Sequence, residues 1–331
     1  MGVNRWWDFQ GALDHPATVA LVVGVVAVLA LSAALIAVLG RAKLVPPERH
    51  AELVARTKSW AVIVPLILLP VLAGSGWTIL ALALLSLLCY REYSRMTGLF
   101  RERLVSATVV VGILGLAFAS LDNWYGLFVA LVPIITTLIA MVAILRDHPE
   151  GYIQRVSLGT FGFLLIGSGL AHLGYLANDV QGRPMILMLL VCVQLNDVFA
   201  FTCGRLFGRH KLAPNTSPGK TVQGSVGALI LTTILTAIIG HFVFRGTPVD
   251  TPIYLIALGL GVSGMGQFGD LTLSSIKRDV GVKDSGALIP GHGGLLDRCN
   301  SLLLVAPGFF YFAHYVGGAH SPLPIHLLTG Q

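Results

Sequence analysis

Residues 17–39, ATVALVVGVVAVLALSAALIAVL, decide the class of this protein. The run contains no charged side chain, and a helix of this length covers the hydrocarbon core of a bilayer, which is about 30 Å thick. It is too long for the core of a signal peptide, and the positive charges of Arg41 and Lys43 follow it instead of preceding it. We therefore predict a transmembrane helix whose amino end lies outside the cell.

The rest of the 331 residues repeats this pattern. Hydrophobic residues make up 55% of the chain and charged residues 11%, and the mean hydropathy is +0.79. We therefore expect an all-α fold, a polytopic transmembrane helical bundle of about ten spans. The predicted spans after the first are 60–73, 77–90, 105–120, 124–145, 158–176, 185–201, 225–244, 252–268 and 302–316. Residues 1–59 would form an extra N-terminal transmembrane helix with a cytoplasmic linker, and residues 60–331 the main membrane domain.

Lysine and arginine are distributed unevenly between the predicted loops. If the amino terminus lies outside, all 22 of these residues except Arg5, Arg183 and Arg245 fall on the cytoplasmic side. This asymmetry predicts an integral membrane protein, of the bacterial inner membrane, with both termini outside. It also explains the net charge of +6 without nucleic-acid binding. The four cysteines have no metal-ligand spacing, so we expect them to be reduced packing residues.

The main anomaly is residues 274–300, SSIKRDVGVKDSGALIPGHGGLLDRCN. Charges of both signs beside apolar spans are costly unless they face water, a metal or a charged ligand. The positive-inside rule alone would account for Lys277 or Arg298, but it does not account for acids such as Asp297. Glycines such as Gly293 and Gly294 let backbone N–H groups approach an anion. Cations with glycines indicate phosphate, and the carboxylates beside them indicate Mg²⁺.

Two other polar segments precede it. Asp197 falls inside the span 185–201, where a carboxylate normally faces the bundle interior and is either metal-linked or hydrogen-bonded between helices. The segment 210–224, HKLAPNTSPGKTVQG, ends in a sequence that resembles a phosphate-binding loop but lacks its full spacing. In 264–270, GMGQFGD, the glycines permit either close helix approach or an unwound segment, and Asp270 is expected to face a cavity.

The order KR, KD, PGHGG and DR in residues 277–298 resembles the signature of phosphatidate cytidylyltransferases, the CDP-diacylglycerol synthases. HKLAP, SPGKT and QG resemble another recurrent segment of that family, and the resemblance covers roughly residues 60–316. Three positions depart from the usual pattern. Cys299 stands where an aliphatic residue is usual, Asn300 where a second aspartate is usual, and Leu273 where many members carry glutamate.

The resemblance implies transfer of a cytidylyl group from CTP to phosphatidic acid, giving CDP-diacylglycerol and pyrophosphate, by a homodimer in contact with membrane lipids. It implies Mg²⁺ held by Asp270 and Asp297, with Asn300 at a weakened site for a second, monovalent cation. The implied catalytic residues are Lys277, Arg278, Lys283, Asp284, His292 and Arg298. The implied substrate-binding residues are Ser217, Lys220, Asp197, Gly293 and Gly294.

Some alternatives stay open at this point. Because a phosphate is already ionised at pH 7, His292 is expected to be a hydrogen-bond donor or an organiser of the glycine turn rather than a general base. Asp284 would be a second cation ligand or would position Lys283. The alternative functions are a paralogue using another lipid phosphate, a CTP-dependent lipid-alcohol kinase, and a non-enzymatic membrane scaffold.

Overall fold

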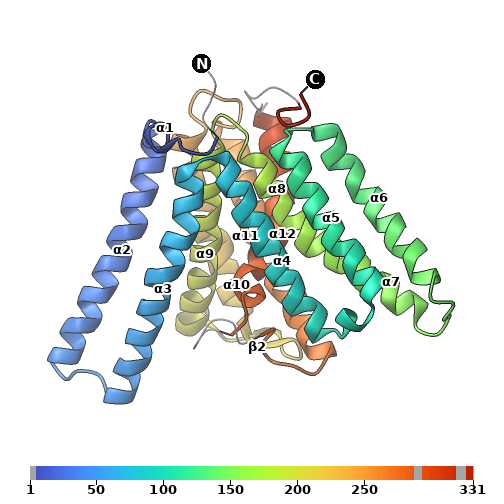
Figure 1. Ribbon diagram of the computed structural model, residues 1–331. Coiled ribbons are helices and arrows are strands. Elements are labelled where there is room, and N and C mark those ends of the chain that lie inside the picture. Colours follow the sequence, from blue (N-terminus) through green and yellow to red (C-terminus); the bar gives the residue numbers. More distant parts are fainter. Residues whose placement is uncertain (1–4, 287–292, 318–325, 331) are drawn as a thin grey trace.

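The computed structural model describes residues 5–286, 293–317 and 326–330 of the chain. Long helices run roughly side by side between the two ends of the molecule, and both chain termini lie at the same end (Figure 1). An even number of crossings brings the two termini to one side of a membrane, as the sequence predicts for ten spans. The fold is therefore an all-α membrane bundle, as expected.

The helices follow one another along almost the whole chain. They are α1 (Phe9–Ala12), α2 (Pro16–Arg41), α3 (Pro47–Ala73), α4 (Ser75–Met96), η1 (Leu99–Arg101), α5 (Arg103–Leu121), α6 (Tyr125–Ile144), α7 (Tyr152–Gly162), η2 (Phe163–Ser168), α8 (Gly169–Leu176), α9 (Gly182–Phe207), α10 (Val222–Val243), α11 (Pro252–Asp279) and α12 (Leu296–Gly317). The segments α7, η2 and α8 form one continuous span with a π-helical turn in its middle.

Among the described residues, nine helices are long and apolar enough to cross a membrane. Each of the ten predicted spans coincides with a long helix, and only 124–145 and 225–244 extend beyond theirs, by one residue at one or both ends. The one predicted span whose helix is not among these nine is α4. It is less apolar because its last turns carry Arg91, Glu92 and Arg95. The charged residues at the end of α4 indicate that this helix also makes polar contacts beyond the apolar core.

The linker after the first span is shorter than predicted. The sequence analysis placed a cytoplasmic connection up to Ser59, but α3 begins at Pro47. Pro47 occupies the first helical turn, where the backbone N–H groups have no partner within the helix and proline is therefore tolerated. The Ala, Glu and Arg residues that follow are good helix formers. Helix α3 therefore extends beyond the apolar core, and the boundary at residues 59/60 falls inside it.

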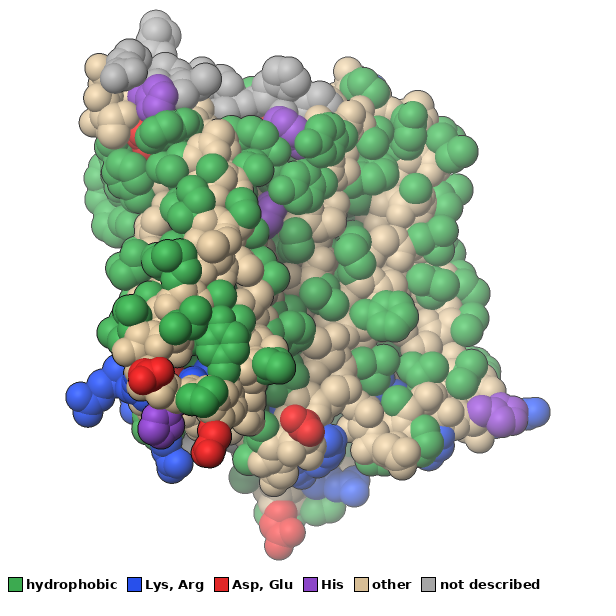
Figure 2. Space-filling model, turned by 90° about the vertical axis from the view of Figure 1, so that its right-hand side faces the viewer, with side chains coloured by type: hydrophobic (Ala, Val, Ile, Leu, Met, Phe, Trp, Pro, Cys, Tyr) green, Lys and Arg blue, Asp and Glu red, His purple; other side chains and the backbone are tan. Residues whose placement is uncertain are grey.

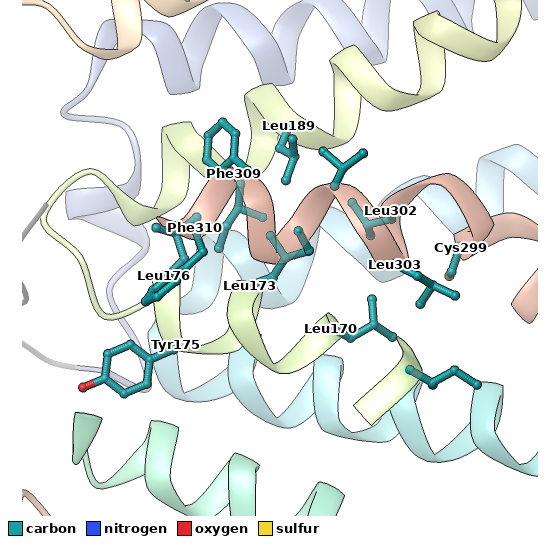
Figure 3. Close-up of a cluster of buried hydrophobic side chains, with 14 of the residues drawn as sticks. Leu170, Leu173, Tyr175, Leu176, Leu189, Cys299, Leu302, Leu303, Phe309 and Phe310 are labelled. Atoms are coloured by element: carbon teal, nitrogen blue, oxygen red, sulfur yellow. The ribbon is translucent and has the colours of Figure 1, made fainter. Parts of the chain in front are cut away.

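Helices α9, α10, α11 and α12 pack in sequence against one another, and α12 also contacts α4 and α8. The contact between α8 and α12 is filled by leucine and phenylalanine side chains such as Leu170, Leu173, Leu303 and Phe310, all at most 3% exposed (Figure 3). This apolar packing fixes the position of α12, whose first turn carries Asp297.

The outer surface suits a lipid environment. Large apolar side chains point outward along the lipid-facing helices, for example Val23 and Leu31 of α2, which are 60% and 70% exposed. Figure 2 shows most of the charged side chains of one face gathered at the lower edge, below a broad uncharged band. That edge is the end opposite the termini, where the loops rich in Lys and Arg lie.

A small hairpin interrupts the helices. Strands β1 (Lys211–Ala213) and β2 (Ser217–Thr221) pair antiparallel, with Lys211 opposite Thr221. Thr221 then caps α10, because its Oγ1 accepts a hydrogen bond from the amide of Gly224. The hairpin thereby attaches the basic segment 210–224 to the start of α10, at the end of the bundle opposite the termini (Figure 1).

Candidate active site

An ion pair joins the hairpin to α11. Lys220 Nζ of β2 lies 2.5 Å from Asp270 Oδ2, and both side chains are about four-fifths buried, with 21% and 24% exposed. On its other side Asp270 Oδ1 accepts a hydrogen bond from Nδ2 of Asn300, 2.5 Å away on α12. Three predicted site residues from three elements thus converge on one carboxylate.

Asp197 of α9 lies beside this group. Both of its oxygens are 3.4 Å from the hydroxyl of Ser301, the residue after Asn300. The charges of Asp270 and Asp197 repel each other, whereas Lys220 and Arg298 attract Asp197. The two carboxylates therefore belong to one cluster, as the depth of Asp197 in its span suggested.

Asn196 explains how α9 presents Asp197. Its amide side chain is completely buried, and its Oδ1 accepts hydrogen bonds from Thr232 of α10 and Ser263 of α11, at 3.0 and 2.6 Å. One amide therefore ties three helices together directly beside the carboxylate. Such interhelical polar contacts fix the rotation of a helix within a membrane bundle.

Helix α11 stays regular through the glycine-rich segment, so the expected close approach occurs and the expected unwinding does not. A Cβ placed on Gly269 would come within 2.6 Å of the backbone oxygen of Asn300. The absence of a side chain at Gly269 thus lets α11 and α12 touch where Asp270 and Asn300 meet.

Asp297 is held one turn before Asn300 on α12. Its Oδ1 accepts a hydrogen bond from Lys277 Nζ at 2.7 Å, and its Oδ2 accepts from the amide and the hydroxyl of Ser285, both at 2.9 Å. The amide of Gly294 also donates to Oδ2, at 3.2 Å. Each oxygen of Asp297 therefore has a protein donor within 2.9 Å, whereas the two oxygens of Asp197 share the Ser301 hydroxyl at 3.4 Å.

The remaining predicted residues are placed as follows. Arg278, Lys283, Asp284 and Arg298 are exposed, and the Arg278 Nε donates to the backbone oxygen of Thr216 in the hairpin at 3.4 Å. Ser217 begins β2, on the strand that carries Lys220. Gly293 has a φ of 77°, a left-handed conformation that favours glycine. His292 lies outside the described residues.

Sequence reasoning missed Glu92. This residue near the end of α4 is only 5% exposed, and its carboxylate accepts hydrogen bonds from the amides of Leu295 and Leu296 at 3.0 and 2.8 Å. In the sequence it stands among arginines at the start of a basic loop. The only available signal was an acidic residue next to an apolar run, which is weak by itself.

The cluster fits Mg²⁺ by the chemistry of its donors. Mg²⁺ in proteins is usually held by one or two carboxylates together with water and substrate phosphates. Asp197 and Asp270 supply two mutually repelling carboxylates whose repulsion a cation would relieve. The described residues contain no group of three or more His, Cys, Asp or Glu side chains arranged for a metal. The assignment of Asp270, Asp297 and Asn300 to the metal stays a prediction.

Comparisons of the sequence with known proteins show its family. A sequence profile described as the cytidylyltransferase family matches residues 54–316. The chain is 36% identical over 278 residues to "Uncharacterized protein YnbB" of Escherichia coli (strain K12), covering 82% of this chain and 90% of that protein. It is 35% identical over 252 residues to the phosphatidate cytidylyltransferase of Staphylococcus haemolyticus (strain JCSC1435) and 32% over 251 residues to that of Staphylococcus aureus (strain COL). Both alignments cover 75% of this chain and 94% of the relative.

Proposed function

The chain belongs to the cytidylyltransferase family and is a membrane-embedded nucleotidyltransferase, and from this premise we propose that it transfers the cytidylyl group of CTP to phosphatidic acid. The products would be CDP-diacylglycerol and pyrophosphate. The observation that carries the proposal is the convergence of Lys220, Asp270, Asn300 and Asp197 at one end of the bundle. Carboxylates and cations at this place suit a reaction between two phosphate compounds.

In the proposed reaction an oxygen of the lipid phosphate attacks the α-phosphorus of CTP. The bond from this phosphorus to the bridging oxygen of the β-phosphate breaks, and pyrophosphate leaves. No proton has to be removed from the attacking oxygen, because the phosphate is ionised at pH 7. The barrier is the repulsion between two anions, so catalysis depends on positioning and charge stabilisation.

The basic residues supply this stabilisation. The Lys220 ammonium, held on β2, and the Lys277 ammonium, held on α11, each pair with an aspartate. When phosphates enter, the same ammonium groups are placed to contact them. The exposed Arg278, Lys283 and Arg298 lie where they attract incoming anions.

Mg²⁺ bound by Asp270, together with Asp197 or Asp297, would neutralise charge that develops on the leaving pyrophosphate. Asp270 already pairs with Lys220 and Asn300, so these two side chains orient its carboxylate for that role. A second, monovalent cation near Asn300 belongs to the same proposal.

We place the cluster on the cytoplasmic side of the inner membrane, with both termini outside. The supports are the loop charges and the position of the hairpin at the end opposite the termini (Figure 1). This orientation gives the site access to CTP from the cytoplasm and to lipid from the inner leaflet. The proposed homodimer follows from the family resemblance.

The test is an assay with purified protein, Mg²⁺, CTP labelled on the α-phosphate, and a panel of acceptors. We expect labelled lipid and equimolar pyrophosphate with phosphatidic acid. Release only with another lipid phosphate, or transfer of the γ-phosphate to a lipid alcohol, would replace this proposal. No transfer to any lipid would leave the scaffold hypothesis.

A matched pair of variants connects the assay to the cluster. Lys220→Met removes the ammonium that pairs with Asp270, and we expect turnover to fall by about 100-fold or more, as when a transition-state donor is removed. Lys43→Met removes an exposed ammonium from the turn between α2 and α3 and should leave turnover unchanged.

A further inference from the structure

The buried carboxylate of Glu92 holds the start of α12. Its Oε1 lies 3.0 Å from the amide nitrogen of Leu295, and its Oε2 lies 2.8 Å from that of Leu296 and 3.2 Å from the hydroxyl of Ser285. The first amides of a helix have no acceptor within the helix, and the positive end of the helix dipole favours a negative charge. A side chain of α4 therefore caps α12 from about 200 positions earlier in the chain.

Glu92 also explains two glycines of the signature. A Cβ on Gly286 would meet Oε1 of Glu92 at 2.8 Å, and its three nearest neighbours would all be atoms of that side chain. A Cβ on Gly294 would meet Oε2 of Glu92 at 2.6 Å. The two glycines thus leave room for the carboxylate, in addition to any role in contacting phosphate.

The same segment holds Asp297. Ser285 donates to Asp297 through its amide, and its hydroxyl is within reach of both Asp297 and Glu92. Gly294 donates its amide to Asp297 as well. The position of Asp297, and of the Lys277 ammonium bonded to it, therefore depends on the backbone that Glu92 fixes.

We infer that Glu92 is a positioning residue of the active site, acting through Asp297 without touching either substrate. The inference rests on the proposed function for its effect on turnover. Its structural half, that Glu92 fixes Ser285, Leu295 and Leu296 against α4, does not depend on the reaction. No relative named above and no feature of the signature assigns this role.

Glu92→Gln keeps the shape of the side chain but replaces one acceptor oxygen with an NH₂ group that faces an amide donor. We expect kcat to fall roughly 10- to 100-fold, as is typical when a group that orients a catalytic carboxylate is changed, with the KM for CTP near the wild-type value. Hydrogen exchange of the Leu295 and Leu296 amides should become faster while that of α4 is unchanged.

Glu102→Gln is the matched control. Glu102 is also a carboxylate near the same end of the bundle, but it pairs with Arg146 at 2.7 Å, away from α12. We expect it to leave both kcat and the exchange of Leu295 and Leu296 unchanged. Wild-type kcat in Glu92→Gln, or wild-type exchange at these two amides, would overturn the inference.

Gly286→Ala tests the same contact from the other side and keeps every charge. The three atoms nearest to the new methyl group all belong to Glu92, so it should displace the carboxylate and lower kcat several-fold. In the Glu92→Ala background these closest contacts are gone, and Gly286→Ala should cause a much smaller further loss. Equal losses in both backgrounds would show that Glu92 is not the partner that matters.

Failure of the proposed function would look different. If the wild-type protein transfers no cytidylyl group, the assignment of the reaction fails, but the exchange of Leu295 and Leu296 still decides whether Glu92 holds the segment. If the wild type is active and Glu92→Gln is equally active, the reaction stands and the role of Glu92 fails.

Discussion

At the scale of single residues, Asp270 and Asp297 differ in their partners. Asp270 joins a lysine of the hairpin to an asparagine of α12, whereas Asp297 is surrounded by donors of its own segment and by Lys277. Asp270→Ala and Asp297→Ala should each lower turnover by about 100-fold or more, because each removes a charge that the transition state needs. Turnover in detergent, with size-exclusion chromatography as the check of folding, measures this.

The control for both variants is Asp250→Ala. This carboxylate pairs with His241 at 2.7 Å. His241 lies in the last turn of α10 and Asp250 just before α11, whereas Lys220 precedes α10 and Asp270 lies in the second half of α11. The variant should retain full turnover. Full activity in either Asp270→Ala or Asp297→Ala, with folded protein, would contradict the assignment of that residue to the metal.

Asn300→Asp should preserve or raise turnover at saturating Mg²⁺. The amide now donates to Asp270, so an aspartate in its place would put two like charges within contact distance. A bound cation relieves that repulsion, and the variant should therefore show a stronger dependence on Mg²⁺ concentration than the wild type. A large loss at saturating Mg²⁺ would instead show that the reaction needs the amide donor.

Individual residues also show which parts of the site could be predicted from the sequence and which could not. Charges in an apolar chain indicated Asp197 and Asp270, because such residues are costly in a membrane without a partner. The family resemblance indicated Lys220 and Asn300. The partners themselves could not be predicted. Glu92 escaped because its function comes from contacts with Leu295 and Leu296, and nothing in its neighbourhood along the chain marks them.

At the scale of elements, the apolar runs predicted every long helix, because a bilayer requires continuous spans of about 20 apolar residues. The hairpin at 211–221 was read as a loop, since strands of three and five residues containing Pro and Gly carry no alternating pattern. The start of α3 was missed because its charged turns lie beyond the apolar core.

Two glycines of the same helix give a prediction at this scale. Gly269→Ala should push α11 away from α12, because its Cβ would lie 2.6 Å from the backbone oxygen of Asn300, which is fixed within α12 and cannot rotate away as a side chain could. We expect a lower melting temperature and lower turnover. Gly264→Ala is the control: its Cβ meets nothing within 4 Å, and the higher helix propensity of alanine should leave stability equal or slightly raised. Equal behaviour of the two variants would contradict a tight α11–α12 contact.

At the scale of the whole molecule, the two chain ends are tied to the bundle at the end opposite the cluster. Asp122, between α5 and α6, accepts hydrogen bonds from the amides of Leu328 and Thr329 at 2.6 and 3.1 Å. Arg5, near the amino terminus, donates to Asn178 at 2.8 Å. These contacts attach both terminal segments to the bundle at the end away from Lys220 and Asp270.

The attachment of the C-terminal turn should depend on pH. Burial raises the pKa of Asp122, but the hydrogen bonds from Leu328, Thr329 and His326 lower it more, so it lies below its ordinary value. A depressed folded-state pKa gives stability above the unfolded pKa of about 3.9, which is lost as pH falls through the folded value. A spin label on Leu328→Cys should therefore be restricted at pH 7 and become mobile in strong acid.

The Asp122→Asn variant distinguishes protonation of the Asp122 carboxylate from acid unfolding of the whole protein. The amide keeps one acceptor oxygen but loses the charge that the two backbone amides favour, so the label should be mobile already at pH 7. A second label, on Ile144→Cys at the far end of α6, should keep its wild-type spectrum in that variant, because it lies beyond the attachment. A restricted label on residue 328 in Asp122→Asn would show that apolar packing, rather than the carboxylate, holds the C-terminal turn.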